Sequence, residues 1–303
     1  MLPILVLCYR RLDTLKQTIE SITVQPHGLI YISCDGVSAE HYEEGKQVHT
    51  YLNHLLDSGV VEEIRISDIN QGTLIGVSEG IDWFFEKVEI GIILEDDLVL
   101  EPELLSTVEI VSKYLRDSKV VAIGLHNSVP LSSITDRNSL VRSSRFVISW
   151  GWVTTRENWN TRVKSYAQIN YWILFYKMLK VIGISSALYH IYFYRREIRV
   201  EKKNITHCNW DNLWQINCFI KNLKVISYNR NMVTNVGFGT DATHTIEKKY
   251  EYPIYPTPIT KINLEQFNEE IQAIDKKAEK YFIKNRKITT IIRAKLRLRQ
   301  RFF

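Results

Sequence analysis

The stretch GIILEDDLVLEP, residues 91–102, runs from an apolar segment directly into three consecutive acids. Carboxylates beside a buried segment are costly unless a cation or hydrogen-bond donors meet them. We therefore expect Glu95, Asp96 and Asp97 to end a buried strand and to face a binding site. Without a metal, at least one of the three should have a raised pKa. A solvated acidic turn is the simpler alternative.

Apolar runs and amphipathic segments alternate on both sides of this stretch. The apolar runs lie at 3–8, 29–34, 90–95 and 120–125, and EEIRIS at 62–67 is a more polar run that also reads as a strand. Each is short enough for a buried strand, and the segments between them have the spacing of helices. Such alternation is typical of an α/β fold in which helices flank a mostly parallel central sheet.

Polar residues follow several of the predicted strands directly. Tyr9 and Arg10 follow the first strand, Asp35 follows the second, and the acid triplet ends the fourth. Ligands of such sheets bind beyond the carboxyl ends of the strands, so one shared pocket is predicted there. Gly72, in NQGTLIG, is expected at a tight entry into a helix near this pocket.

The acid triplet suits a divalent cation. Mn²⁺ and Mg²⁺ prefer oxygen ligands, and Mg²⁺ is usually held by one or two carboxylates together with substrate phosphates. Such a metal would stabilise a departing diphosphate. His244, in the stretch NVGFGTDATHT, is a further candidate ligand, with an ordinary polar loop as the alternative.

A second carboxylate site is predicted at Trp210-Asp211-Asn212. Partial burial between aromatic residues would raise the pKa of Asp211 towards that of a general base. A plain helix cap is the alternative, because Asp and Asn are favoured at that position. Trp150, Trp152 and Trp210 are candidates for a surface that binds an acceptor sugar, although tryptophans of this kind also fill cores.

Positive charge is concentrated at the end of the chain. The protein has 303 residues and a net charge of +5, yet residues 284–303 carry eight basic residues and no acid, which leaves −3 for the rest. Ile288, Ile292 and Leu296 form an apolar stripe between the basic residues, as in helices that lie on anionic membranes. A solvated helix face or disordered tail is the ordinary alternative. Nucleic-acid binding is disfavoured by the acidic remainder of the chain.

The four cysteines show no metal-binding spacing, and no signal peptide is evident at the start of the chain. A cytoplasmic location is expected, with the tail at the inner face of the membrane. Residues 171–196 are strongly apolar but are interrupted by lysines, so a buried or membrane-lying helix is favoured over a spanning one.

The ordered motifs carry a resemblance. The strand-terminal Asp35-Gly36, the triplet at 95–97, GWVTTRENW and NWDNLW resemble, in order and spacing, the nucleotide-sugar glycosyltransferases of the GT-A fold. They are most similar to the N-acetylglucosaminyltransferase I type and its bacterial relatives, which have an acidic triplet of the same form. The resemblance covers roughly residues 3–245.

The resemblance implies roles for individual residues. Asp97 would bind the metal, Glu95 and Asp96 would approach the ribose and diphosphate, and Asp211 would be the base. Asp35 would hydrogen-bond the uracil, and the rest of the nucleotide cleft would be formed by the main chain of Cys8 and Tyr9 and by the Arg10 side chain. This chain departs from the family pattern because Asn212 stands where a second aspartate is expected.

Taken together, the sequence predicts a GT-A domain with a C-terminal helical extension. Residues 1–125 would bind the donor, residues 126–260 would bind the acceptor and carry the base, and residues 261–303 would form the basic extension. The expected activity is inverting transfer from a UDP-sugar to a glycan or lipid-linked acceptor, in bacterial surface polysaccharide synthesis. A nucleotidyltransferase and a non-catalytic membrane-associated scaffold are the alternatives.

Overall fold

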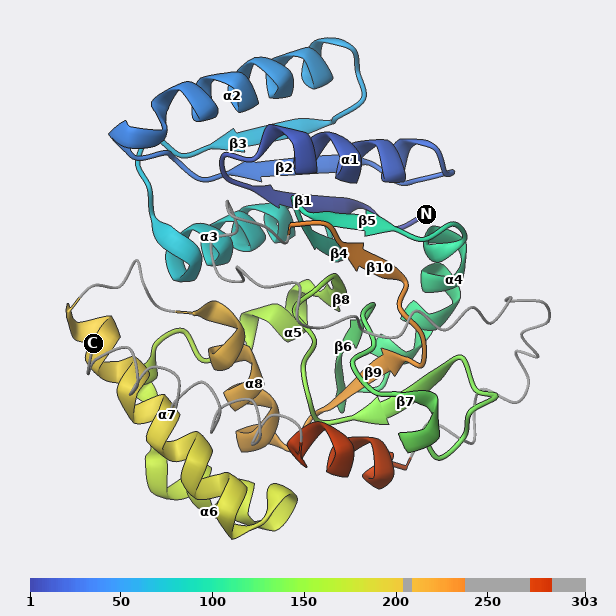
Figure 1. Cartoon of the computed structure of the whole chain (residues 1–303), viewed down its shortest axis with the longest axis vertical. Helices are drawn as coiled ribbons and strands as arrows, with labels where there is room; N and C mark the ends of the chain where they lie inside the picture. Colours follow the sequence, from blue (N-terminus) through green and yellow to red (C-terminus); the bar gives the residue numbers. More distant parts are fainter. Residues whose placement is uncertain (204–208, 238–272, 285–303) are drawn as a thin grey trace, which may run out of the picture.

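The computed structural model describes residues 1–203, 209–237 and 273–284 (Figure 1). His244 and residues 285–303 therefore lie outside the described residues. An eight-stranded sheet with the order β3-β2-β1-β4-β8-β6-β9-β7 runs through the molecule from the top to the centre of Figure 1. Its strands are β1 (Ile4–Cys8), β2 (Ile30–Cys34), β3 (Glu63–Ile66), β4 (Ile90–Glu95), β6 (Val120–Gly124), β7 (Val141–Ser144), β8 (Trp152–Thr155) and β9 (Lys224–Tyr228).

The sheet is mostly parallel, as predicted. Strands β3, β2, β1 and β4 pair in parallel, and β6 pairs in parallel with β9. Strand β8 enters between β4 and β6 antiparallel to both, and β7 closes the edge antiparallel to β9. The α/β class with helices around a mostly parallel sheet is confirmed. The antiparallel β7 and β8 were not predicted, because their short mixed sequences lack the long apolar runs of the parallel strands.

Helices cover both faces of the sheet because alternate strand residues point to opposite sides. Ile4 and Val6 of β1 join a core cluster with α1 (Leu12–Thr23), α2 (Tyr42–Asp57) and α4 (Leu104–Val111). Leu5 and Leu7 join a second cluster with α3 (Gly72–Lys87) and α8 (Trp210–Lys221). The polar residues of the candidate site follow the carboxyl ends of the parallel strands.

A small second sheet shapes the chain around the acid triplet. Strand β5 (Leu98–Leu100) leaves the main sheet after β4 and pairs antiparallel with β10 (Val233–Asn235). Asp96 and Asp97 form the two-residue turn between β4 and β5. The chain therefore passes from the main sheet to the small sheet at Asp96 and Asp97.

The described part of the C-terminal extension is a helix over residues 276–284 that packs against the main body. Asp275 caps it, with Oδ1 accepting hydrogen bonds from the main-chain N–H groups of Lys277 (3.1 Å) and Ala278 (3.0 Å). Buried Glu279 holds the guanidinium of Arg145, with Nη2 donating to Oε2 at 2.5 Å. A predicted helical extension is thus present in this stretch.

Residues 171–196 fold as two helices joined at Gly183, which has a φ of +73°. Helix α6 (Tyr171–Ile182) and most of helix α7 (Ile184–Lys203) account for the apolar segment. Within the described ranges, neither these nor any other helix has the length and apolar character needed to cross a bilayer.

Acid should destabilise the fold through His126, which follows β6 and is buried beside Trp150. Burial, aided by the charge of Arg142, lowers the pKa of His126 from 6.5 to about 4. Between these values the unfolded chain binds a proton at His126 that the folded chain does not bind, so the contribution of His126 to stability falls as the pH drops from 6.5 to 4. The raised pKa values of Glu95 and Asp96 contribute with the opposite sign, so the effect of His126 is the difference between the wild type and a variant without the imidazole. We expect a loss on the order of 3 kcal/mol from this group. Urea unfolding at both pH values should show this loss reduced in His126→Phe, and an equal loss in both proteins would contradict it.

Candidate active site

The acid triplet lies at the carboxyl end of β4, as predicted. Asp96 and Asp97 are only 4% and 6% exposed, and Glu95 is half-buried. The Asp96 carboxylate also accepts a hydrogen bond from the main-chain N–H of Tyr9 (3.3 Å), which ties this turn to the end of β1. The triplet is therefore built into the sheet edge, and the solvated-turn interpretation is wrong for Asp96 and Asp97.

A residue that sequence analysis passed over meets these acids. Arg11 directly precedes α1, and its Nη2 donates to Asp96 Oδ1 and to Asp97 Oδ2, both at 2.8 Å. Burial opposes the charged form of Arg11, but the two carboxylates outweigh it and raise its pKa. Nothing local distinguished Arg11 from Arg10, which turns away and pairs with Glu44 on α2 at 2.8 Å.

A segment from far along the sequence closes around Asp97. After β10, Asn235 Nδ2 donates to Asp97 Oδ1 (3.3 Å), and the Val236 N–H donates to the Asp97 carbonyl (2.8 Å). Gly237 packs against the Asp97 side chain so closely that a Cβ there would collide with it. This residue must be glycine for the loop to reach the acid.

The charges of the turn are not balanced. Burial, followed by repulsion from Asp97, Asp96 and Asp211, raises the pKa of Glu95 to about 8. Burial also raises the pKa of Asp96 to about 6, although Arg11 opposes the shift. The prediction that one acid of the triplet titrates high is confirmed for Glu95. A single guanidinium does not neutralise three crowded carboxyl groups.

Removing the Arg11 cation should destabilise the fold much more than removing its neighbour. Arg11→Gln leaves two buried carboxylates without a counter-charge, for which we expect a loss of about 3 kcal/mol in the free energy of unfolding. Arg10→Gln is the matched control, and its half-exposed pair with Glu44 is worth about 1 kcal/mol or less. Chemical denaturation at neutral pH measures both, and equal losses would show that Arg11 is not the stabilising cation.

Asp35 organises the entry into α3. Its carboxylate accepts hydrogen bonds from the main-chain N–H groups of Gly36, Gln71 and Gly72, each at 3.0 Å. Gly72 has a φ of +74°, which favours glycine at this tight turn. The predicted helix entry at Gly72 is confirmed, and Asp35 positions it. The predicted contact of Asp35 with uracil remains a prediction.

The other residues predicted to bind the donor surround the same strand ends. Asn70 Nδ2 donates to Tyr9 Oη at 2.8 Å, which joins the end of β1 to the loop before α3. Cys8 is buried against Cys34, its register partner on β2. Tyr9, Asp35, Gly72 and the triplet thus share one edge of the sheet, as predicted from their positions after the strands.

The tertiary structure also brings Asp211 to this edge. Asp211 lies in the first turn of α8, and its charge raises the pKa of Glu95 and that of Glu197 on α7. These residues are 116 and 14 positions away from it in the sequence. Asp211 and the acid triplet therefore belong to one electrostatic unit.

Several tryptophans cluster around the start of α8, where Trp210 directly precedes Asp211. Trp152 and Trp159 are 1% exposed, and Trp152 stacks on Trp210 with ring centroids 5.5 Å apart. Trp152 is thus in the core and has no ring face open to solvent, whereas Trp150 is half-buried. Of the three predicted acceptor residues, Trp210 lines the pocket between α3 and α8.

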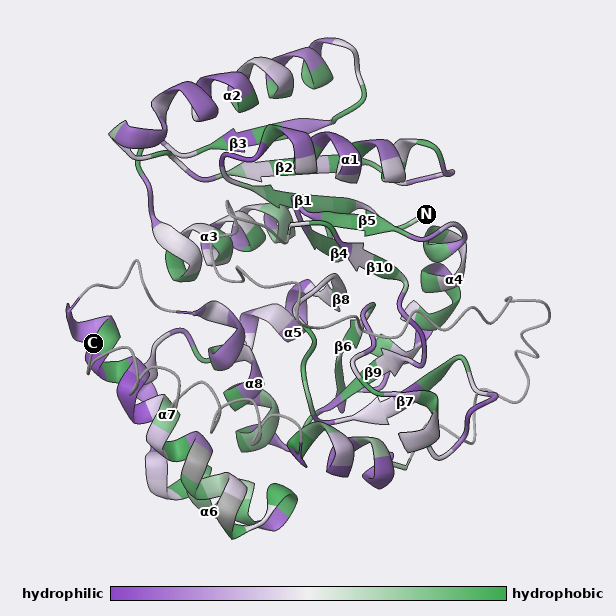
Figure 2. Ribbon diagram, in the orientation of Figure 1, coloured by the Kyte–Doolittle hydropathy of each residue, from purple (hydrophilic) through white to green (hydrophobic). Residues whose placement is uncertain are grey.

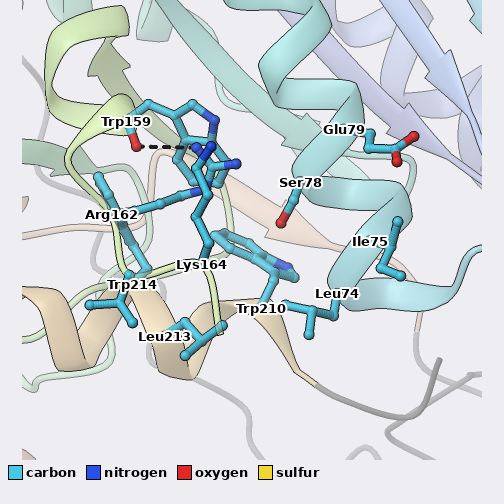
Figure 3. Close-up of a pocket in the computed structure, with 11 residues that line it drawn as sticks. Leu74, Ile75, Ser78, Glu79, Trp159, Arg162, Lys164, Trp210, Leu213 and Trp214 are labelled. Atoms are coloured by element: carbon cyan, nitrogen blue, oxygen red, sulfur yellow. Dashed lines mark hydrogen bonds between the residues drawn. The ribbon is translucent and has the colours of Figure 1, made fainter. Parts of the chain in front are cut away.

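This pocket lies between α3 and α8 (Figure 3). Helix α8 contributes Trp210, Leu213 and Trp214, and the segment after α5 (Arg156–Asn160) contributes Arg162 and Lys164. Arg162 stacks over Trp159 at 3.9 Å and pairs with Asp82 at 2.8 Å. Among the described residues, the Trp214 Nε1 hydrogen has no acceptor. The pocket therefore has a largely apolar wall, with the cationic side chains of Arg162 and Lys164 among its lining residues.

The chemistry of the acid triplet suits a divalent cation, because Mn²⁺ and Mg²⁺ bind oxygen ligands and prefer negatively charged carboxylates. The carboxylates of the triplet do not form a ready metal site, since no group of three His, Cys, Asp or Glu side chains in the described ranges is placed to hold a metal. Arg11 and Asn235 take the two Asp97 oxygens. A metal at Asp97 would have to displace Arg11.

Comparison with known proteins gives likenesses of fold at low similarity. No protein-family model matches the chain, and no curated protein matches it. Among solved structures, TarS 1–349 from S. aureus aligns with 77% of this chain at 8% identity and a TM-score of 0.41. Mannosyltransferase PcManGT from Pyrobaculum calidifontis, in complex with GDP-Man and Mn²⁺, aligns with 72% at 12% identity and a TM-score of 0.38. GalNAc-T7 with UDP, GalNAc and Mn²⁺ aligns with 75% at 11% identity and a TM-score of 0.42.

The chain spans only part of two of these structures. It covers 60% of the TarS structure and 44% of GalNAc-T7, against 69% of PcManGT. Likenesses at this level do not define the chemistry of a site. The chemistry of the site depends on its own side chains.

Proposed function

We propose that this protein is a glycosyltransferase that moves a sugar from a UDP-sugar to a hydroxyl group of a glycan or lipid-linked acceptor. The observation that supports it best is the cluster of buried acids at the carboxyl end of β4, whose Glu95 also feels the negative charge of Asp211. A base and a charged leaving-group site at one sheet edge are what a displacement at an anomeric carbon requires. The narrower kinship with the N-acetylglucosaminyltransferase I type is part of the proposal.

In the proposed reaction Asp211 accepts the proton of the acceptor hydroxyl. The oxygen then attacks the anomeric carbon on the face opposite the diphosphate, and the bond from that carbon to the diphosphate breaks. A single displacement of this kind inverts the anomeric configuration. It needs one base and no enzyme nucleophile, so no second catalytic carboxylate is required for covalent chemistry.

The donor is proposed to lie across the strand ends. Tyr9 and Asp35 would bind the nucleotide together with the main chain of Cys8, and Glu95 and Asp96 would face its ribose and diphosphate. Arg10 would have to leave Glu44 to join them. Asp97 would hold Mn²⁺ or Mg²⁺, completed by substrate oxygens and, in the proposal, by His244. When bound, the metal would supply positive charge to the departing diphosphate.

The acceptor is proposed to bind on the Trp210 side of α8. The support is the pocket, whose wall includes Trp159, Trp210 and Trp214 with Arg162 and Lys164 beside them. Aromatic rings bind the apolar faces of sugars. Trp150 remains a weaker candidate for the same surface.

The direct test is release of UDP from a panel of UDP-sugars, with Mn²⁺ and a mixture of glycan and lipid-linked acceptors. Sugar-dependent release of UDP would support the proposal. Consumption of a nucleoside triphosphate with release of pyrophosphate would instead identify the alternative, a nucleotidyltransferase. A scaffold without activity should fail to bind UDP in calorimetry at any metal concentration.

The cellular setting is a further part of the proposal. We place the protein at the inner face of a bacterial cytoplasmic membrane, in surface polysaccharide synthesis, with residues 284–303 on anionic lipid. The support is the eight basic residues and the apolar stripe of that segment. Nucleic acid is not a proposed partner.

A further inference from the structure

Helices α6 and α7 expose an unusual amount of apolar surface. Seven large apolar side chains on this pair are at least 37% exposed, and Trp172 and Tyr192 reach 80% and 74%. The set comprises Trp172, Ile173, Tyr176, Leu179, Ile184, Leu188 and Tyr192, which we call the hairpin face. Figure 1 places the two helices at the lower left of the molecule, below β1, β2 and β3.

The hairpin face is ordered along each helix. Trp172, Tyr176 and Leu179 are three and four residues apart on α6, and Ile184, Leu188 and Tyr192 are four apart on α7, so each helix bears one stripe. The opposite sides of the helices bury residues such as Leu174, Met178 and Tyr194 in the core. Both stripes approach Gly183, where the helices join. The apolar exposure is therefore a second face and not a failure of core packing.

The charges beside this face have one sign. Residues 171–203 contain seven basic and two acidic side chains, in contrast to the net negative charge of the chain before the basic tail. One of the two acids, Glu197, is buried. On α7 the stripe continues from Tyr192 into Arg195 and Arg199, and Figure 2 shows α7 changing from apolar to hydrophilic along its length. On α6 the Lys180 ammonium lies 4.3 Å from the centre of the Tyr176 ring.

We propose that the hairpin face binds the surface of an anionic lipid bilayer. Exposed Trp and Tyr beside aliphatic residues suit the boundary between headgroups and acyl chains. Lys and Arg at the margin suit the headgroup phosphates, and each strengthens binding by about five-fold near an anionic surface. The helices lie on the membrane and do not cross it. This surface consists of residues other than 284–303, and its binding requires neither donor nor catalysis, so it stands even if the proposed transfer activity fails.

Vesicle flotation with the full chain tests the proposal. We expect binding to vesicles of phosphatidylcholine with phosphatidylglycerol, and much weaker binding to phosphatidylcholine alone. Replacing Trp172, Ile184 and Tyr192 with serine should weaken binding at least ten-fold, and Lys180→Glu with Arg199→Glu should do the same. The matched control replaces three exposed apolar residues elsewhere, Val24, Leu29 and Tyr42, with serine and should bind as the wild type does.

Trp172 supplies a readout specific to this face. The other tryptophans, at positions 83, 150, 152, 159, 210 and 214, are buried or half-buried, so brominated lipids should quench the fluorescence of Trp172 selectively. Trp172→Phe should keep the binding and lose the quenching. Circular dichroism and thermal melting of each variant show that a loss of binding is not a loss of folding.

Three outcomes would overturn the proposal. The first is no binding of the wild type to anionic vesicles. The second is full binding by the serine variant together with loss of binding when the basic residues from Arg293 to Arg301 become glutamine. This result would show that residues 284–303 alone bind the membrane. The third is self-association that the serine variant removes in sedimentation without lipid binding, which would identify a second copy of the chain as the occupant.

Discussion

Asp211→Asn is expected to reduce sugar transfer by about 10²- to 10⁴-fold while UDP binding stays within a few-fold of the wild type. The asparagine keeps the size and polarity of the side chain but cannot accept the acceptor proton. The loss should appear in kcat and not in the donor KM, because the base acts on the acceptor. Initial rates of UDP release and calorimetric titration with UDP measure the two quantities.

A structural role for Asp211 makes a different prediction. An acid in the first turn of a helix stabilises it by about 0.3–1 kcal/mol through the helix dipole, so a purely structural Asp211 would affect stability slightly and turnover not at all. Asp13→Asn is the matched control, since Asp13 is an exposed acid in the first turn of α1. Equal turnover in Asp211→Asn and Asp13→Asn would remove Asp211 as the base.

Asp97→Asn is expected to lower turnover by at least about 100-fold and to abolish the strengthening of UDP binding by Mn²⁺. Asparagine can still contact Asn235 but holds neither a divalent cation nor Arg11 strongly. Titration of UDP with Mn²⁺ and with a chelator separates the metal-dependent part of binding from the rest. The wild type should bind UDP more tightly with Mn²⁺, and the variant should bind equally in both conditions.

The control for Asp97 is an acid that lies away from the site. Asp57 ends α2 and is exposed, so Asp57→Asn should leave turnover and metal dependence unchanged. Thermal stability must be compared as well, because Asp97→Asn also frees part of the Arg11 guanidinium. Unchanged Mn²⁺ dependence in Asp97→Asn would show that the metal, if required, binds elsewhere.

Much of the fold could be predicted because its determinants are local. The buried parallel strands read as continuous apolar runs, and α1 shows its core face in the spacing of Leu15, Ile19 and Ile22. Strand β8 could not be predicted in the same way. Its Trp152-Val-Thr-Thr sequence becomes a central strand only because β4 and β6 leave a place between them.

The candidate site was predictable only in part, because some of its contacts follow from the order of the strands and others join residues far apart in the sequence. Residues at strand ends share one edge because parallel strands end together, so the grouping of Asp35 with the triplet followed from the order of elements. The contacts of Arg11, Asn235 and Gly237 with Asp97 span 86, 138 and 140 positions of sequence. No local pattern encodes such distances. Arg10 and Arg11 are chemically identical, and only the start of α1 directs one to the acids and the other to α2.

By itself the sequence determined the alternating α/β order, the position of Glu95, Asp96 and Asp97 at a strand end, and the excess of charge that makes one of them titrate high. These depend on the periodicity of neighbouring residues and on the cost of crowding carboxylates in one turn. Only the tertiary structure decided which cation meets the acids, that Asp211 approaches Glu95, and that the apolar residues of α6 and α7 form an outer face. Those outcomes depend on how distant elements pack, because charge and exposure are properties of the surroundings that a residue acquires on folding.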